Sequence, residues 1–184
     1  MLKKLCLNIV KKLYKLTGAE IVLFLYLAYN ADEKGVVKGI FYKEAIENTD
    51  LSITHFYHSM DALQDKGFIK HTEEKDERWV GDEHARFTVL ILNNDYSEIM
   101  AMGEKKDFSH KPYVSLNPEV LHTREFRDAT KNVKILILKF LELLNTKPYR
   151  EKEKLSFNYK DLLAWTMIYC KDSKSRKEVS LRAL

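Results

Sequence analysis

The amino-acid sequence predicts a mostly helical α+β fold with one small β-hairpin. Three observations support this prediction. Apolar residues recur at helical spacing between residues 52 and 69. Phe87, Val89 and Ile91 stand at alternate positions, as in a half-buried strand. The 184 residues include only 6 glycines and 3 prolines, and so few breaking residues favour helices over turns.

The stretch 52–69, SITHFYHSMDALQDKGFI, is the most informative part of the chain. Its apolar face consists of Ile53, Phe56, Met60 and Leu63. Ser52 stands where a hydroxyl caps the first free N–H groups of a helix. Gly67 stands where a helix ends in a left-handed residue, so we expect a strand to start at Phe68. The stretch therefore predicts one helix that leads into the first strand of the hairpin.

The preceding residues predict a helix-turn-helix. A helix that is apolar nearly all round is expected over 19–31, a short strand over 36–40 and a second helix over 41–47. Residues 48–51 form the turn before the central helix. After this helix, residues 68–72 pair with 86–92, and the intervening loop holds six acidic residues between 73 and 83.

The central stretch resembles a known superfamily. Its pattern is Leu51-Ser52, Phe56, Leu63 and Lys66-Gly67-Phe68-Ile69. It is similar to the recognition helix and first wing strand of winged helix-turn-helix proteins. Multiple-antibiotic-resistance repressors and the replication proteins of Gram-positive plasmids and phages carry such a pattern. The resemblance covers about residues 18–92. It implies a protein that binds double-stranded DNA, first of all a transcriptional regulator.

The resemblance also implies which residues contact DNA. The base-edge candidates are Ser52, Thr54, His55, Tyr57 and His58. Hydroxyl and imidazole groups can hydrogen-bond in the major groove, although the helix has no arginine. The phosphate or wing candidates in this region are Lys43, Lys75 and Arg78. Outside the resemblance, Lys174, Arg176, Lys177 and Arg182 are further phosphate candidates because of their clustered positive charge. For the base-edge candidates, the alternative is a solvated or protein-contacting helix face. For Lys75 and Arg78 it is a solvated wing loop, and for the candidates between 174 and 182 it is an ordinary basic tail.

The charge distribution conflicts with DNA binding by this domain. Residues 1–17 hold five lysines and no acid, residues 18–92 hold 8 basic and 14 acidic residues, and residues 93–184 hold 18 basic and 13 acidic residues. A phosphate-binding surface needs clustered Lys and Arg. The segment with the helix-turn-helix pattern is the acidic one. A winged helix that binds protein and not DNA is therefore a third alternative.

Residues 1–17 predict a basic amphipathic helix. Its apolar stripe is Leu2, Leu5, Ile9, Leu13 and Leu16. Such a stripe is too apolar for a lone surface helix, and DNA-binding proteins of this type often read two half-sites as dimers. We therefore expect a homodimer through residues 1–17. A basic arm on phosphate and a short membrane-surface helix are the alternatives.

The remaining residues predict a winged-helix domain over 18–95, a connector over 96–126 and a helical second domain over 127–184. An extended strand is expected at 113–116, and residues 132–144 form a strongly apolar helix. Residues 157–163 and 175–179 parallel 41–45 and 52–56, which indicates a weak internal repeat. A real repeat would make the second half an incomplete winged helix. It would also favour the alternative of a plasmid or phage replication initiator with tandem winged helices.

Other classes of function find little support. The two isolated cysteines, Cys6 and Cys170, offer no disulfide framework, so we expect a cytoplasmic protein. The longest apolar run, 21–31, is too short to span a bilayer, so no membrane partner is expected. The pairs His55–His58 and His71–His84 lack further ligands, so we expect neither metal nor cofactor. No catalytic motif is present, and we expect no enzyme activity.

Overall fold

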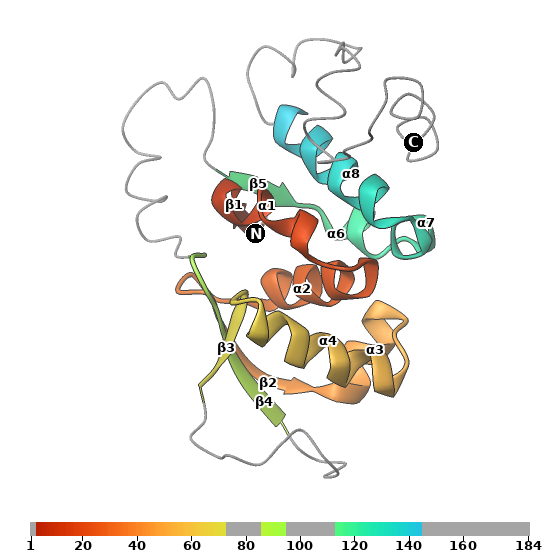
Figure 1. The fold of residues 1–184 in the computed structure, drawn as a ribbon. Coiled ribbons are helices and arrows are strands. Elements are labelled where there is room, and N and C mark those ends of the chain that lie inside the picture. Colours follow the sequence, from red (N-terminus) through yellow and green to blue (C-terminus); the bar gives the residue numbers. More distant parts are fainter. Residues whose placement is uncertain (1–2, 73–85, 95–112, 145–184) are drawn as a thin grey trace.

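The computed structural model describes residues 3–72, 86–94 and 113–144, and these residues form an α+β fold with two small antiparallel sheets (Figure 1). In chain order the elements are β1 (Lys3–Cys6), α1 (Leu7–Val10), the 3-10 helix η1 (Leu13–Lys15), α2 (Gly18–Asn30), β2 (Val36–Phe41), α3 (Tyr42–Thr49), α4 (Ile53–Asp65), β3 (Ile69–His71), β4 (Arg86–Ile91), β5 (Tyr113–Leu116), α6 (Pro118–Leu121), α7 (Arg124–Asp128) and α8 (Lys131–Leu144). The predicted fold class is confirmed at this level.

Helix α2 lies at the centre of the fold. Figure 1 shows α3, α4 and the three-stranded sheet on one side of α2, and β1, β5 and α8 on the other. Thr17 begins the helix with a capping box, in which its side chain accepts from the Glu20 N–H and the Glu20 carboxylate accepts from the Thr17 N–H. Residues from Ile21 to Ala28 are buried except for the half-buried Tyr26. The expected buried helix is therefore confirmed.

Helices α3 and α4 and the turn between them form as the local sequence predicts. Asp50 closes α3 in a left-handed conformation with φ of 58°, which turns the chain into α4. Ser52 caps α4 by accepting from the His55 N–H at 3.2 Å. At the other end Gly67 has a positive φ of 71°, and the Phe68 N–H donates to the Leu63 carbonyl. The buried face of α4 contains Phe56, Met60 and Leu63, as expected, but the prediction that Ile53 belongs to this face is wrong, because Ile53 is the first residue of the helix and is 56% exposed.

The hairpin strands β3 and β4 pair antiparallel, and β2 completes a sheet of order β2-β4-β3. Ile69 faces Ile91, and Phe41 faces Arg86. Phe87, Val89 and Ile91 point into the core, so the predicted alternation is confirmed. The wing loop of residues 73–83 lies outside the described residues.

The predicted helix over residues 1–17 is wrong. Residues 3–15 form β1, α1 and η1 instead. Strand β1 pairs antiparallel with β5, and Lys3 faces Leu116. The strand forms because it hydrogen-bonds to β5. This partner lies more than a hundred residues away in the chain, so the spacing of apolar residues within 1–17 cannot reveal it.

The apolar stripe of this segment is nevertheless buried. Leu5, Ile9, Leu13 and Leu16 are each at most 3% exposed within the same chain. The homodimer was expected because this stripe needed a cover. The chain's own core supplies that cover, so the stripe gives no argument for a dimer.

The described residues 113–144 contribute to the same core. The strand expected at 113–116 is β5, which confirms that prediction. The rest of the expected connector includes α6 and α7, whose Leu121 and Phe126 are buried. Ile135 and Leu138 of α8 join the core cluster that also contains Leu5 and Phe56. The described residues 3–72, 86–94 and 113–144 therefore share one hydrophobic core cluster, and the division into a winged-helix domain, a connector and a second domain stays a prediction.

The order strand, short helix, short helical turn, long helix occurs twice. β1, α1, η1 and α2 form the first copy, and β5, α6, α7 and α8 form the second. A threonine begins the long helix in both copies: Thr17 accepts from the Glu20 N–H at 3.3 Å, and Thr130 accepts from the Val133 N–H at 3.5 Å. The two runs of elements join through the β1–β5 pair. Residues 157–163 and 175–179, on which the predicted repeat rests, lie outside the described residues.

Leu63→Ala should lower the free energy of unfolding by about 2–5 kcal/mol, because it opens a cavity beneath a fully buried side chain. Ile53→Ala on the same helix is the control, since the Ile53 side chain is 56% exposed and its loss should cost at most about 0.5 kcal/mol. Urea unfolding of the two variants measures the difference. Equal stability of both variants would contradict the packing of α4.

Candidate nucleic-acid interface

The exposed face of α4 carries most of the predicted base-edge residues. Thr54, His55 and His58 are exposed, and Tyr57 is half-buried at the side of the helix. Ser52 is exposed at the helix start, where its hydroxyl lies 2.9 Å from His55 Nδ1. This contact orients the His55 ring. The side chains of Thr54, His55, Tyr57 and His58 all lie within the first two turns of α4.

Acidic side chains share this surface. Asp61 and Asp65 are exposed in the second half of α4, and Asp61 stands one turn after His58. In the span 42–65 of α3 and α4, Lys43 is the one basic residue against five acids. The charge conflict found in the sequence therefore persists on the folded surface.

An aromatic cluster joins Tyr57 to two cations. The Tyr42 ring lies 6.3 Å from the Tyr57 ring, and the Lys43 ammonium lies 5.9 Å from the Tyr42 ring. Arg86 lies 5.6 Å from the Phe41 ring and donates to the Gly39 carbonyl at 3.2 Å.

Arg86 was not predicted as a site residue from the sequence. Its position beside β2 depends on the pairing of Phe41 with Arg86, which is a long-range register.

Burial raises the pKa of Tyr57, and the neighbouring Tyr42 raises it further. The Tyr57 hydroxyl therefore stays protonated and can donate a hydrogen bond at neutral pH.

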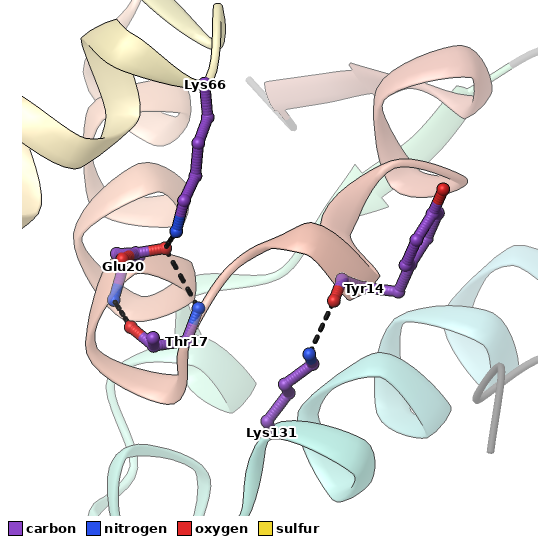
Figure 2. A network of polar contacts seen from close by, with 5 residues as sticks. All are labelled: Tyr14, Thr17, Glu20, Lys66 and Lys131. Atoms are coloured by element: carbon purple, nitrogen blue, oxygen red, sulfur yellow. Dashed lines mark hydrogen bonds and ion pairs between the residues drawn. The ribbon is translucent and has the colours of Figure 1, made fainter. Parts of the chain in front are cut away.

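Lys66, the lysine at the end of the central stretch, is engaged within the fold. Figure 2 shows its ammonium beside Glu20, at 2.6 Å from the carboxylate. The same carboxylate oxygen accepts from the Thr17 N–H at 2.9 Å. Glu20 is 6% exposed, so this contact ties the end of α4 to the beginning of α2. Lys66 therefore holds the helix in place and contributes little charge toward DNA.

Lys43 is the one predicted phosphate or wing residue that the described ranges include. Lys75, Arg78, Lys174, Arg176, Lys177 and Arg182 lie outside the described residues. The same holds for His84, so the His71–His84 pair is not tested. Within the described ranges, no group of three or more His, Cys, Asp or Glu side chains could hold a metal ion.

A hollow of about 220 Å³ lies beside the helix-turn-helix turn. Gly18 and Ala19 of α2, Thr49 to Leu51 of the turn, and residues of α7 and α8 line it. The buried Lys134 ammonium donates to the carbonyls of Arg127 and Ala129 at the end of α7. Burial lowers the pKa of Lys134, while the Asp128 carboxylate acts in the opposite direction. The hollow has charged walls and borders the residues that orient α4.

Comparisons with known proteins add no assignment. No protein-family model matches the chain, and no curated protein or solved structure matches it. In the part of the chain that the structure describes, no helix has both the length and the apolar character needed to cross a membrane.

Glu20→Ala should lower the free energy of unfolding by about 1–3 kcal/mol, because it removes one half of the capping box and the partner of Lys66. Glu20→Gln is the matched control, since the amide oxygen can still accept from the Thr17 N–H. Its effect on stability should be smaller. A double-mutant cycle with Lys66→Ala should give a coupling of about 0.5–3 kcal/mol in urea unfolding. Additive effects would contradict the link between α2 and α4.

Proposed function

We propose that residues 18–94 form a winged helix-turn-helix and that the protein binds double-stranded DNA through α4, as a transcriptional regulator. One observation carries this proposal. A polar, exposed helix start follows the α3–α4 turn, and a hairpin flanks it in a sheet of order β2-β4-β3. In helix-turn-helix proteins the second helix enters the major groove with its N-terminal residues against the base edges.

Each side chain has a distinct role in this proposal. Thr54 and His58 hydrogen-bond to base edges, and Tyr57 donates from the side of the helix. Lys43 and Arg86, which lie over the rings of Tyr42 and Phe41, contact phosphates, which position the protein without reading sequence. Ser52 and His55 act as a pair, because the hydroxyl of one orients the ring of the other.

The hollow beside the turn favours a regulator over a replication initiator. A ligand between the start of α2 and Asp50 would touch the residues that set the angle of α4. The initiator remains the alternative, and the repeat of β1–α2 as β5–α8 supports it. Repeated binding sites at an origin would distinguish the initiator from the regulator.

A protein-binding winged helix is the candidate from another class. The acidic excess on α3 and α4 supports it, since this surface repels phosphate. The pairing of Lys66 with Glu20 removes a further cation from the DNA-facing side.

Two double variants should change duplex binding in different ways, one in sequence preference and the other in overall affinity. Thr54→Ala with His58→Ala should change the preference among duplex sequences, by about 1–3 kcal/mol for each base that is no longer read. Lys43→Ala with Arg86→Ala should weaken binding to all duplexes about equally, because phosphates carry no sequence information. Selection from random duplexes, followed by anisotropy titration of the selected sequences, measures both effects.

Asn8→Ala is the control for the α4 variant, since Asn8 is exposed on α1 and its replacement should change nothing. If the wild-type protein binds no duplex at low salt, where the phosphate term is largest, the protein-binding candidate replaces the DNA-binding one.

A further inference from the structure

Lysines gather on the segment that joins α1 to α2. Lys11, Lys12 and Lys15 are exposed, and Tyr14 between them is 37% exposed. The Lys131 side chain from the start of α8 donates to the Tyr14 carbonyl, as Figure 2 shows. We call these four lysines, together with Tyr14, the lysine patch.

The segments that carry the lysine patch contain few acidic residues. No acidic residue occurs in the chain before Glu20, and none occurs between Asp128 and Glu142. Glu20 is buried against Lys66, and Glu142 is paired with Lys139 at 2.7 Å. The positive charge of the patch is therefore not neutralised from within its own elements.

The patch has the chemistry of a phosphate-binding surface and not of a membrane anchor. An interfacial helix needs an apolar face that it can insert among lipids. Here the apolar positions Leu5, Ile9, Leu13 and Leu16 are buried in the core. Exposed ammonium groups around an exposed aromatic ring suit a nucleic-acid backbone with an unpaired or terminal base nearby.

The patch and the exposed face of α4 point in different directions. α4 packs its apolar face on α2, so its polar face points away from α2. Segment 7–15 lies on the other side of α2, next to α8 (Figure 1).

We infer that the lysine patch binds the phosphate backbone of a nucleic-acid segment, without sequence preference, at a surface separate from α4. The segment is a different one from any duplex held by α4. The inference does not depend on base reading by α4, because it rests on the patch's own charge and exposure.

The test compares two triple variants of the full chain. Lys11→Ala, Lys12→Ala and Lys15→Ala together remove the exposed charges of the patch. Lys34→Ala, Lys38→Ala and Lys70→Ala remove the same charge from the sheet and its turn, where all three lysines are exposed. Anisotropy titrations against duplexes of several sequences, at several salt concentrations, give the affinity and its salt dependence. Thermal melts confirm that both variants are folded.

The patch variant should bind every duplex more weakly, and its log–log salt slope should fall by about 0.9 for each phosphate that the protein no longer neutralises. Equal weakening of both triple variants would overturn the inference, since net charge alone would then explain the binding. An unchanged patch variant would overturn it as well. So would binding to phosphatidylserine vesicles in the absence of duplex binding.

A bridging assay separates this inference from the proposed function. A monomeric wild-type protein should link a bead-bound duplex to a labelled one, and both the patch variant and the Lys43→Ala/Arg86→Ala variant should weaken this link. Patch-dependent binding without bridging supports the lysine patch and counts against α4 as a DNA site. Bridging that survives the removal of the patch lysines overturns the inference.

Discussion

The burial of α2 is the constraint on which the rest of the structure depends. Ile21 to Leu25 are all buried, so this helix has apolar side chains on every side and no solvent-facing stripe. A helix of this kind must be covered all round. α3 and α4 provide the cover on one side, and β1, α6 and α8 provide it on the others. Its buried acid, Glu20, is satisfied by the Thr17 N–H and by Lys66.

What the sequence predicted well was local. The apolar spacing of α4, the Ser52 cap and the positive φ at Gly67 involve residues within a few positions of one another. The segment 1–17 was mispredicted for the opposite reason. Its apolar spacing fits a helix, but β1 forms because Val114 and Leu116 of β5 supply its partner strand. The burial of its stripe was predictable, whereas the secondary structure that buries it was not.

The candidate site also contains features that local sequence predicts and features that depend on long-range contacts. The polar face of α4 follows from helical periodicity, and the structure places it on the surface as expected. The partner of Lys66 and the position of Arg86 depend on long-range contacts with Glu20 and Phe41. The first engages Lys66 within the fold, and the second places the Arg86 guanidinium over the Phe41 ring. Neither change follows from composition or spacing.

The charge pattern of α4 constrains how it could meet DNA. Asp61 and Asp65 lie in its second half, whereas Thr54 and His58 lie nearer its start. The start of a helix carries the positive end of its dipole, which attracts phosphate, and the acidic second half repels it. Lys43 lies over the ring of Tyr42, which neighbours Tyr57 in the first two turns of α4. A duplex would therefore approach α4 end-on through its first two turns, with Asp61 and Asp65 held out of the groove.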